Sequence, residues 1–155
     1  MTTYFLDASA LAKRYLTETG SQWTLTVTNP AAGHTIIVAE ITRVEVASAL
    51  AARYRAPLGI SQQQRDRAVK LLLHHCLTQY RTASLNPATI SRAVNLTQNY
   101  RLRGYDAVQL ATAIITNDAL VVAGLPEPTF VAADSDLLAA AQAEGLTTDN
   151  PNLYP

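Results

Sequence analysis

The chain has 155 residues, of which 48% are hydrophobic and 15% are charged, and its formal net charge at pH 7 is zero. This length suits a single domain with a sizeable core, and the composition excludes a disordered chain. The lone cysteine, Cys76, excludes an internal disulfide framework and a cysteine-based zinc site.

Short apolar strands alternate with helices along the chain. In chain order we predict a strand at Thr3–Leu6, helices at Ala8–Tyr15 and Ser21–Thr28, a strand at Thr35–Val38, a helix from Thr42 that stops before Pro57, and a helix from Ser61 through Cys76. There follow a strand at Ala83–Leu85, helices at Pro87–Tyr100 and Tyr105–Thr116, a strand at Thr129–Ala132 and a helix at Ser135–Glu144. This order predicts one α/β domain over residues 1–146 with a small, mainly parallel sheet, followed by an extended C-terminal tail over residues 147–155.

Two helices carry apolar stripes, and one connection is unusual. The stripes are Val46, Leu50 and Tyr54 in one helix and Ala68, Leu71, Leu72 and Cys76 in the next. The stretch from Asn117 to Pro128 looks long for the connection before the last strand.

Charge is unevenly distributed along the chain. Residues 41–103 carry ten basic side chains against two acidic ones, whereas residues 104–155 carry seven acidic side chains and no basic one. This pattern is compatible with a polyanion lying across the basic half, although the charges alone favour solvated helix faces. The low share of charge indicates surface buried against a second copy or a protein partner. With no apolar run long enough for a membrane and no signal-peptide pattern, we expect a cytoplasmic protein.

Four carboxylates fall where helices are predicted to begin. Asp7 directly follows the first strand and Asp134 lies just past the last predicted strand, while Glu45 and Asp106 lie in first helical turns. Because the carboxyl ends of parallel strands meet at one edge of a sheet, we expect these acids to face one cleft. Each acid by itself also suits helix capping, and Thr42 with Glu45 has the spacing of a capping box.

A cluster of oxygen ligands without histidine selects a hard cation, Mg²⁺ or Mn²⁺. Such an ion lowers the pKa of a bound water and stabilises a departing oxygen, which indicates phosphodiester or phosphoryl transfer. The three histidines, His34, His74 and His75, lack a metal-ligand spacing, so we interpret them as structural.

Four stretches, taken together and in order, resemble the PIN-domain family. They are Phe5-Leu-Asp7-Ala-Ser9-Ala-Leu, Thr42-Arg-Val-Glu45-Val-Ala-Ser-Ala-Leu, Leu102-Arg-Gly-Tyr-Asp106-Ala-Val-Gln-Leu-Ala and Phe130-Val-Ala-Ala-Asp134-Ser-Asp136-Leu-Leu. Within that family the chain is most similar to VapC-type toxin ribonucleases of type II toxin–antitoxin pairs. The resemblance implies a PIN-like α/β/α fold, a Mg²⁺- or Mn²⁺-dependent endoribonuclease with RNA as substrate, a cognate antitoxin as partner, and a homodimer.

The resemblance also implies roles for individual residues. The acidic quartet of the family corresponds to Asp7, Glu45, Asp106 and Asp134. Of these, Asp7, Asp106 and Asp134 would be metal ligands, and Glu45 would hold a metal-bound water or a second ion. Ser9 matches a small hydroxyl residue of the family that orients Asp7 or a phosphate. Candidate additions are Asp136 as an accessory acid, and Lys13, Arg14, Arg43 and part of the basic set from Arg53 to Lys70 as contacts to substrate phosphates.

Two departures and one ambiguity accompany the resemblance. Many relatives have serine or threonine where this chain has Ala132, which puts one polar contact in doubt. The long stretch 117–128 has no assigned role. Glu40 lies five residues before Glu45, but Glu45 carries the family pattern, and Glu40 is expected to cap or pair.

Two other functions are weighed against the ribonuclease. A binding module of the same fold would use its acidic cleft for an arginine of a protein partner, and the intact acidic quartet counts against it. A phosphatase with Asp7 as nucleophile needs a second aspartate two residues later, where this chain has Ser9.

Overall fold

A computed structural model describes residues 1–155, and its centre is a five-stranded parallel sheet. The strands are β1 (Thr3–Leu6), β2 (Thr35–Ala39), β3 (Arg81–Ala83), β4 (Thr129–Val131) and β5 (Thr148–Asp149), in the spatial order β3-β2-β1-β4-β5. The central strand β1 pairs on one side with β2 and on the other with β4. The strand order therefore reverses between β1 and β4, which is where parallel sheets open a crevice for ligands.

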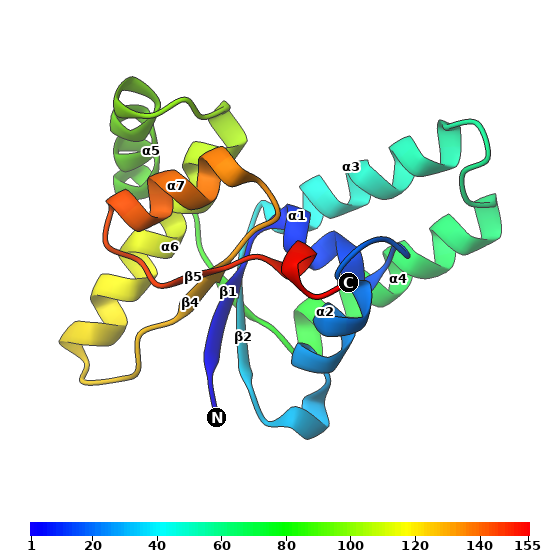
Figure 1. Cartoon of the computed structure of the whole chain (residues 1–155), viewed down its shortest axis with the longest axis horizontal. Coiled ribbons are helices and arrows are strands. Elements are labelled where there is room, and N and C mark those ends of the chain that lie inside the picture. Colours follow the sequence, from blue (N-terminus) through cyan, green and yellow to red (C-terminus); the bar gives the residue numbers. More distant parts are fainter.

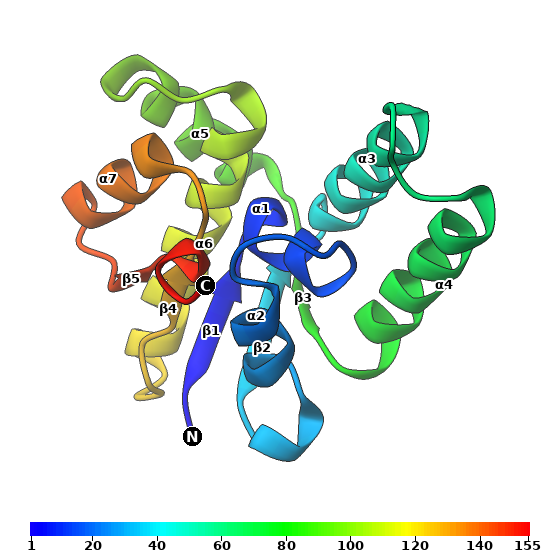
Figure 2. The ribbon, with the colours of Figure 1, turned by 45° about the vertical axis from the view of Figure 1, so that its right-hand side comes forward.

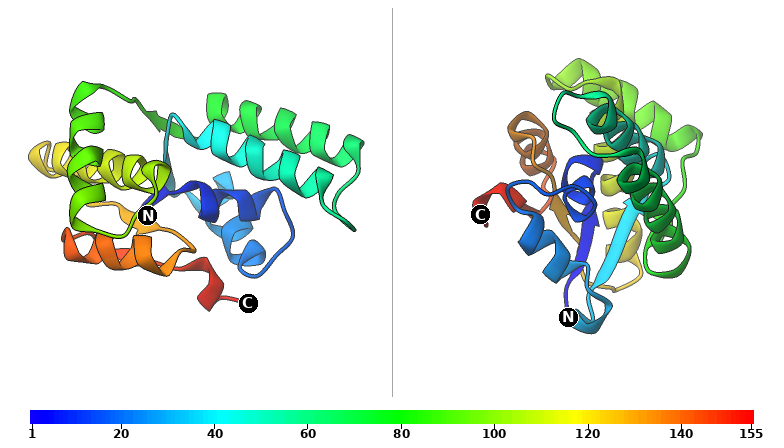
Figure 3. Two further views of the ribbon diagram at one scale, coloured as in Figure 1. Left: turned by 90° about the horizontal axis from the view of Figure 1, so that it is seen from above. Right: turned by 90° about the vertical axis from the view of Figure 1, so that its right-hand side faces the viewer.

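Helices cover both faces of this sheet. They are α1 (Ala8–Leu11), α2 (Ser21–Val27), α3 (Thr42–Arg55), α4 (Gln62–Thr78), α5 (Pro87–Asn99), α6 (Gly104–Val122) and α7 (Ser135–Ala143), with 3-10 turns at Ala12–Arg14, Pro30–Ala32 and Pro151–Leu153. Figure 1 shows α5, α6 and α7 on one side of the sheet and α2, α3 and α4 on the other. Seen from above in Figure 3, α3 and α4 form a hairpin that extends beyond the sheet. The predicted α/β/α arrangement is confirmed.

Alternating strand residues build two separate hydrophobic cores. Phe5 and Phe130 face α5, α6 and α7, and their rings stack with centroids 5.9 Å apart. Their neighbours Leu6 and Val131 face the opposite way, into a core with α1, α3 and α4. This follows from the two-residue period of a strand, which sends successive side chains to opposite faces. None of the helices has the length and apolar composition that a membrane crossing requires.

Local capping signals explain most of the observed helix boundaries. The Ser61 hydroxyl accepts from the backbone N–H of Gln64, whose side chain accepts in turn from the Ser61 backbone N–H, so α4 begins in a capping box. The Asn86 side chain accepts from the backbone N–H of Thr89 and so caps α5, without the reciprocal bond of a capping box. Gly145 follows α7 with φ of +89°, a conformation that glycine adopts without a steric penalty.

Several predicted elements differ from the structure. The predicted helix at Ala8–Tyr15 is divided into α1 and a 3-10 turn. Helix α6 continues to Val122 because Leu120 still packs on the core, so the long connection predicted over 117–128 is wrong in its first half. Strand β3 lies two residues earlier than predicted, because pairing with β2 rather than apolarity sets its register. It is an edge strand with two exposed residues, which leaves no apolar signal to read.

Two stripe residues and the tail also differ from the prediction. Tyr54 and Leu71 are 38% and 40% exposed, because α3 and α4 pack on the sheet with only Val46, Leu50, Leu72 and Cys76 buried on that face. The C-terminal residues return to the sheet as β5 and end in a 3-10 turn. There Tyr154 stacks on Trp23 of α2, with ring centroids 5.0 Å apart. Figure 2 shows this end of the chain lying beside α2.

Candidate active site

Asp7 and Ser9 join the ends of the two central strands. The backbone N–H of Asp7 donates to the carbonyl of Val131 at 3.0 Å, and its Oδ1 accepts from the N–H of Ala10 at 2.9 Å, which caps α1. The Ser9 hydroxyl lies 2.7 and 2.9 Å from the two carboxylate oxygens and accepts from the N–H of Ala133 at 2.9 Å. The carboxylate is therefore held rigidly between β1 and β4.

The environment of Asp7 disfavours its charge. The residue is only 3% exposed. Burial raises the pKa of Asp7 to about 7, although the hydrogen bonds from Ala10 and Ser9 act in the opposite direction. A carboxylate that is costly to ionise and fixed in place is a frequent feature of functional sites.

Glu45 is held by a residue that sequence reasoning missed. Gln109 of α6 is buried, and its Nε2 donates to Glu45 Oε1 at 2.9 Å and to the Thr42 hydroxyl at 2.8 Å. The capping box predicted for Thr42 and Glu45 is wrong, because Ile41 occupies the N-cap and both side chains bind across to α6 instead. A polar residue three positions after Asp106, in an otherwise apolar stretch, was the available signal for Gln109.

Asp106 and Asp134 lie together on the other side of the crevice. Asp134 caps α7 by accepting from the N–H of Leu137 at 2.8 Å, whereas Asp106 lies in the first turn of α6 and the N-cap is Arg103. Both acids line a pocket of about 400 Å³. Its other charged lining residues are Asp136, Arg101 and Arg103.

The four acids of the predicted quartet influence one another. The charge of Glu45 contributes to the raised pKa of Asp7. Burial raises the pKa of Glu45, with a further contribution from Asp106. Burial likewise raises the pKa of Asp106, with a further contribution from Asp134. The fold therefore gathers like charges at the carboxyl ends of β1 and β4, where a bound cation would relieve their repulsion.

The arrangement suits a cation in its chemistry but is not a preformed cage. No group of three or more histidine, cysteine, aspartate or glutamate side chains is close enough to hold a metal ion as the side chains stand. The donors are all carboxylate oxygens, the ligand type that hard divalent cations prefer. Burial is the main cause of the raised pKa values of Asp7, Glu45 and Asp106, and the charge of Arg103 only partly offsets it at Asp106.

The predicted phosphate contacts Lys13 and Arg43 have different surroundings. Lys13 is buried, and its Nζ lies 3.2 Å from Glu18 Oε1. Glu18 also pairs with Arg53, at 3.3 Å. Arg43 instead pairs with the exposed Glu40 at 3.5 Å and is not brought to the acids, which confirms Glu40 as a pairing residue.

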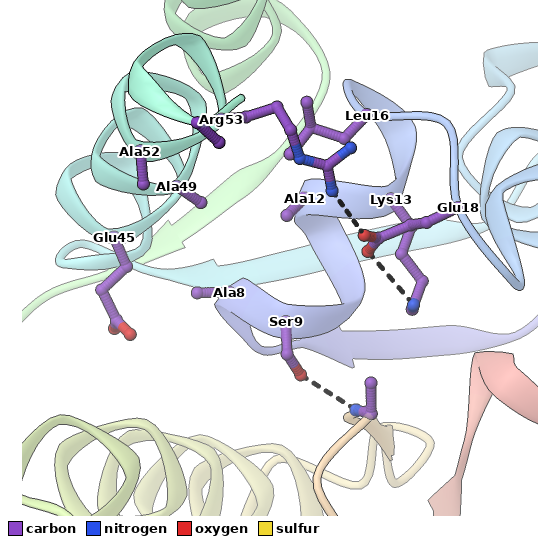
Figure 4. Close-up of a pocket in the computed structure, with 12 residues that line it drawn as sticks. Ala8, Ser9, Ala12, Lys13, Leu16, Glu18, Glu45, Ala49, Ala52 and Arg53 are labelled. Carbon is purple, nitrogen blue, oxygen red and sulfur yellow. Dashed lines mark hydrogen bonds and ion pairs between the residues drawn. The ribbon is translucent and has the colours of Figure 1, made fainter. Parts of the chain in front are cut away.

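A pocket of about 600 Å³ connects Lys13, Glu18 and Arg53 with the acidic site. Figure 4 shows Ser9 and Glu45 on one side of it, and Glu18 between Lys13 and Arg53 on the other. Glu18 was missed in the sequence, because a glutamate in a loop carries no local signal of a shared pocket, whereas Arg53 belongs to the basic set expected to contact substrate phosphates.

Comparison with known proteins identifies the family. The model of the PIN domain matches residues 4–142, and the chain belongs to this family. No curated protein matches the chain significantly.

Solved structures show the same fold. One is VapC20 of Mycobacterium tuberculosis, described as a toxin that cleaves the sarcin-ricin loop, at 17% identity and a TM-score of 0.62, covering 98% of this chain and 99% of that one. Another is VapBC2 of Rickettsia felis, described as bound to a DNA fragment from its promoter, at 13% identity and a TM-score of 0.61, covering 96% and 98%. At these identities the likeness establishes the fold alone.

Proposed function

We propose that this protein is a metal-dependent endoribonuclease and the toxin of a toxin–antitoxin pair. The observation that carries the proposal is a row of four carboxylates in a PIN-domain protein, Asp7, Glu45, Asp106 and Asp134, in which each acid lies close enough to the next for their charges to interact. Nearly full-length structural similarity to VapC20, itself described as a toxin that cleaves the sarcin-ricin loop, supports the choice of RNA as substrate.

The residues have distinct parts in this proposal. Asp7, Asp106 and Asp134 would hold Mg²⁺ or Mn²⁺, and Asp136 is near enough to serve as an accessory acid. The ion would supply charge stabilisation at the phosphate and lower the pKa of a water. Ser9 holds the Asp7 carboxylate in one orientation through its hydroxyl.

In this proposal Glu45 would hold the attacking water and accept a proton from it. Gln109 donates to its Oε1, which leaves Oε2 without a partner in the protein, and Glu45 lines the pocket beside Ser9. The raised pKa of Glu45 makes it a stronger base than an exposed carboxylate, as general base catalysis near neutral pH requires.

Binding partners follow from the same family. We propose a cognate antitoxin, in keeping with the VapBC2 description, and a homodimer in the cytoplasm. Exposed apolar side chains on α3, α4 and α5 supply surface for both contacts; they are Val44, Leu73, Leu77, Ile90 and Val94.

The test is cleavage of a structured RNA pool in Mg²⁺, Mn²⁺ or EDTA. Wild type is compared with Asp7→Asn and Asp106→Asn, and with Asp118→Asn as a matched control, since Asp118 is an exposed aspartate at the far end of α6. We expect divalent-dependent cutting that is lost in the first two variants and kept in the control. Cutting that survives EDTA or both variants contradicts the proposal. No cutting by folded, partner-free protein would favour a binding module that uses its acidic cleft for a protein partner.

A further inference from the structure

A groove lined by basic side chains continues from the acidic site toward α4. The pocket that contains Lys13 and Arg53 shares Arg53 and Leu16 with a second pocket of about 350 Å³. The second pocket lies between the 3-10 turn after α1 and the α3–α4 hairpin, and its basic residues are Arg14, Arg53 and Arg67. We call the two connected pockets the basic groove, after the four basic side chains that line them, Lys13, Arg53, Arg14 and Arg67.

Positive charge is in excess along this groove. Glu18 is the only carboxylate that contacts its cations, and it is shared between Lys13 and Arg53. Neither Arg14 nor Arg67 forms an ion pair, and no acidic residue lines the second pocket. An anion entering the groove would therefore meet cations that the protein leaves uncompensated.

Arg14 is held in place before any ligand arrives. Its Nη1 donates to the Tyr80 hydroxyl, and the guanidinium lies over the Tyr80 ring, 5.5 Å from the centroid. The Tyr80 hydroxyl lies 2.8 Å from that of Tyr15, which in turn lies 2.8 Å from His75 Nδ1. A cation fixed by such a network loses less conformational freedom when it binds an anion.

The position of the groove indicates which kind of anion it binds. One end opens on Ser9 and Glu45, where the proposed reaction occurs, so a strand cut there has to continue into the space beside it. The groove offers several separate cations in sequence rather than a single site, which suits a repeating backbone of phosphates. An acidic peptide would match the cations but not the carboxylates at the other end.

We propose that the basic groove binds backbone phosphates of single-stranded RNA on one side of the cleavage site, with Lys13 and Arg53 nearest the cut and Arg14 and Arg67 farther along. This inference rests on the proposed function. Arg53 and Arg67 would then bind the flanking strand through the charge of its phosphates, independently of its base sequence.

The test measures RNA affinity as a function of NaCl concentration. A fluorescein-labelled single-stranded RNA is titrated with full-length protein carrying Asp7→Asn, to prevent cutting, alone and combined with Arg53→Gln, Arg67→Gln or Arg55→Gln. Arg55 is the matched control, because it lies exposed on the same helix as Arg53 and lines neither pocket. Thermal unfolding of each variant checks that it is folded.

The expected results separate groove cations from general charge. Arg53→Gln and Arg67→Gln should each weaken RNA binding about threefold to tenfold at low salt and reduce the salt slope by about 0.7. Arg55→Gln should change affinity less than about twofold. With Asp7 intact, Arg67→Gln should raise KM for a long RNA and leave kcat within about twofold.

Four outcomes would overturn the inference. Equal effects of all three arginine variants would show a general charge effect. No effect of any variant, in a protein that does cleave RNA, would leave the ribonuclease intact and remove the groove from it. If the arginine variants bind RNA like the parent protein but bind poly-glutamate, titrated in the same way, more weakly than the parent does, the groove would be assigned to an acidic protein segment. A wild-type protein that neither binds nor cuts RNA would refute the inference together with the proposed function.

Discussion

Replacing Asp7 with asparagine should stabilise the metal-free protein above neutral pH. The amide oxygen of asparagine can still accept from the N–H of Ala10, so the cap of α1 is kept while the buried charge is removed. Burial raises the pKa of Asp7 from 3.8 to about 7. In the unfolded chain this carboxyl ionises near its ordinary pKa, whereas in the folded protein it keeps its proton until about neutral pH.

The sign and size of the effect follow from this difference. Between the two pKa values the folded state binds more protons than the unfolded state, so wild-type stability falls as pH rises through this window. The full difference corresponds to about 4 kcal/mol, and from pH 5 to pH 8 the expected loss is about 2–3 kcal/mol. The asparagine variant lacks this contribution at every pH.

Urea denaturation in EDTA at pH 5, 6, 7 and 8 measures the effect. The free energy of unfolding of Asp7→Asn, minus that of wild type, should grow by about 2–3 kcal/mol over this range, whereas Asp118→Asn should run parallel to wild type. Excess Mn²⁺ at pH 8 should stabilise wild type more than Asp7→Asn. Parallel curves for Asp7→Asn and wild type between pH 5 and pH 8 would refute the reasoning, because they would mean that the carboxyl is ionised in the folded protein throughout.

Three further predictions concern Gln109, Glu18 and the C-terminal residues. Gln109→Ala should lower the rate of RNA cleavage about tenfold. It should also move the acidic limb of the pH–rate profile to higher pH, because the hydrogen bond that lowers the pKa of Glu45 is lost. An acidic limb that does not move would contradict this role of Gln109. Glu18→Gln should lower the free energy of unfolding by about 1–2 kcal/mol, because buried Lys13 loses its carboxylate, and should tighten RNA binding in the same titration used for the groove. Weaker RNA binding would show that Glu18 does not shield the groove. Deleting residues 147–155 removes β5 and the aromatic stack on α2. The free energy of unfolding, measured by urea denaturation with tryptophan fluorescence, should fall by about 3 kcal/mol. An unchanged free energy of unfolding would show that the pairing of β5 contributes nothing to stability.

Sequence reasoning located the acidic residues because their signals are local. Asp7 directly follows an apolar strand, and Asp134 precedes a helix that it caps. A parallel sheet then places both at one edge, whatever the details of packing. Short apolar runs and capping residues likewise predicted most elements to within one or two residues of their observed ends.

The rest depended on contacts between distant parts of the chain. Ser9 binds a backbone N–H 124 residues away, and Gln109 binds Glu45 across 64 residues. Arg53 meets Glu18 across 35 residues, which turns two unremarkable surface charges into one wall of a pocket. The register of β3 and the return of the C-terminal residues as β5 were decided by pairing with a neighbouring strand. The sequence by itself determined which residues end strands and begin helices, because those preferences act within a few residues. Only the tertiary structure decided which polar side chains meet, because that depends on how α3, α6 and the loop before α2 pack around the sheet.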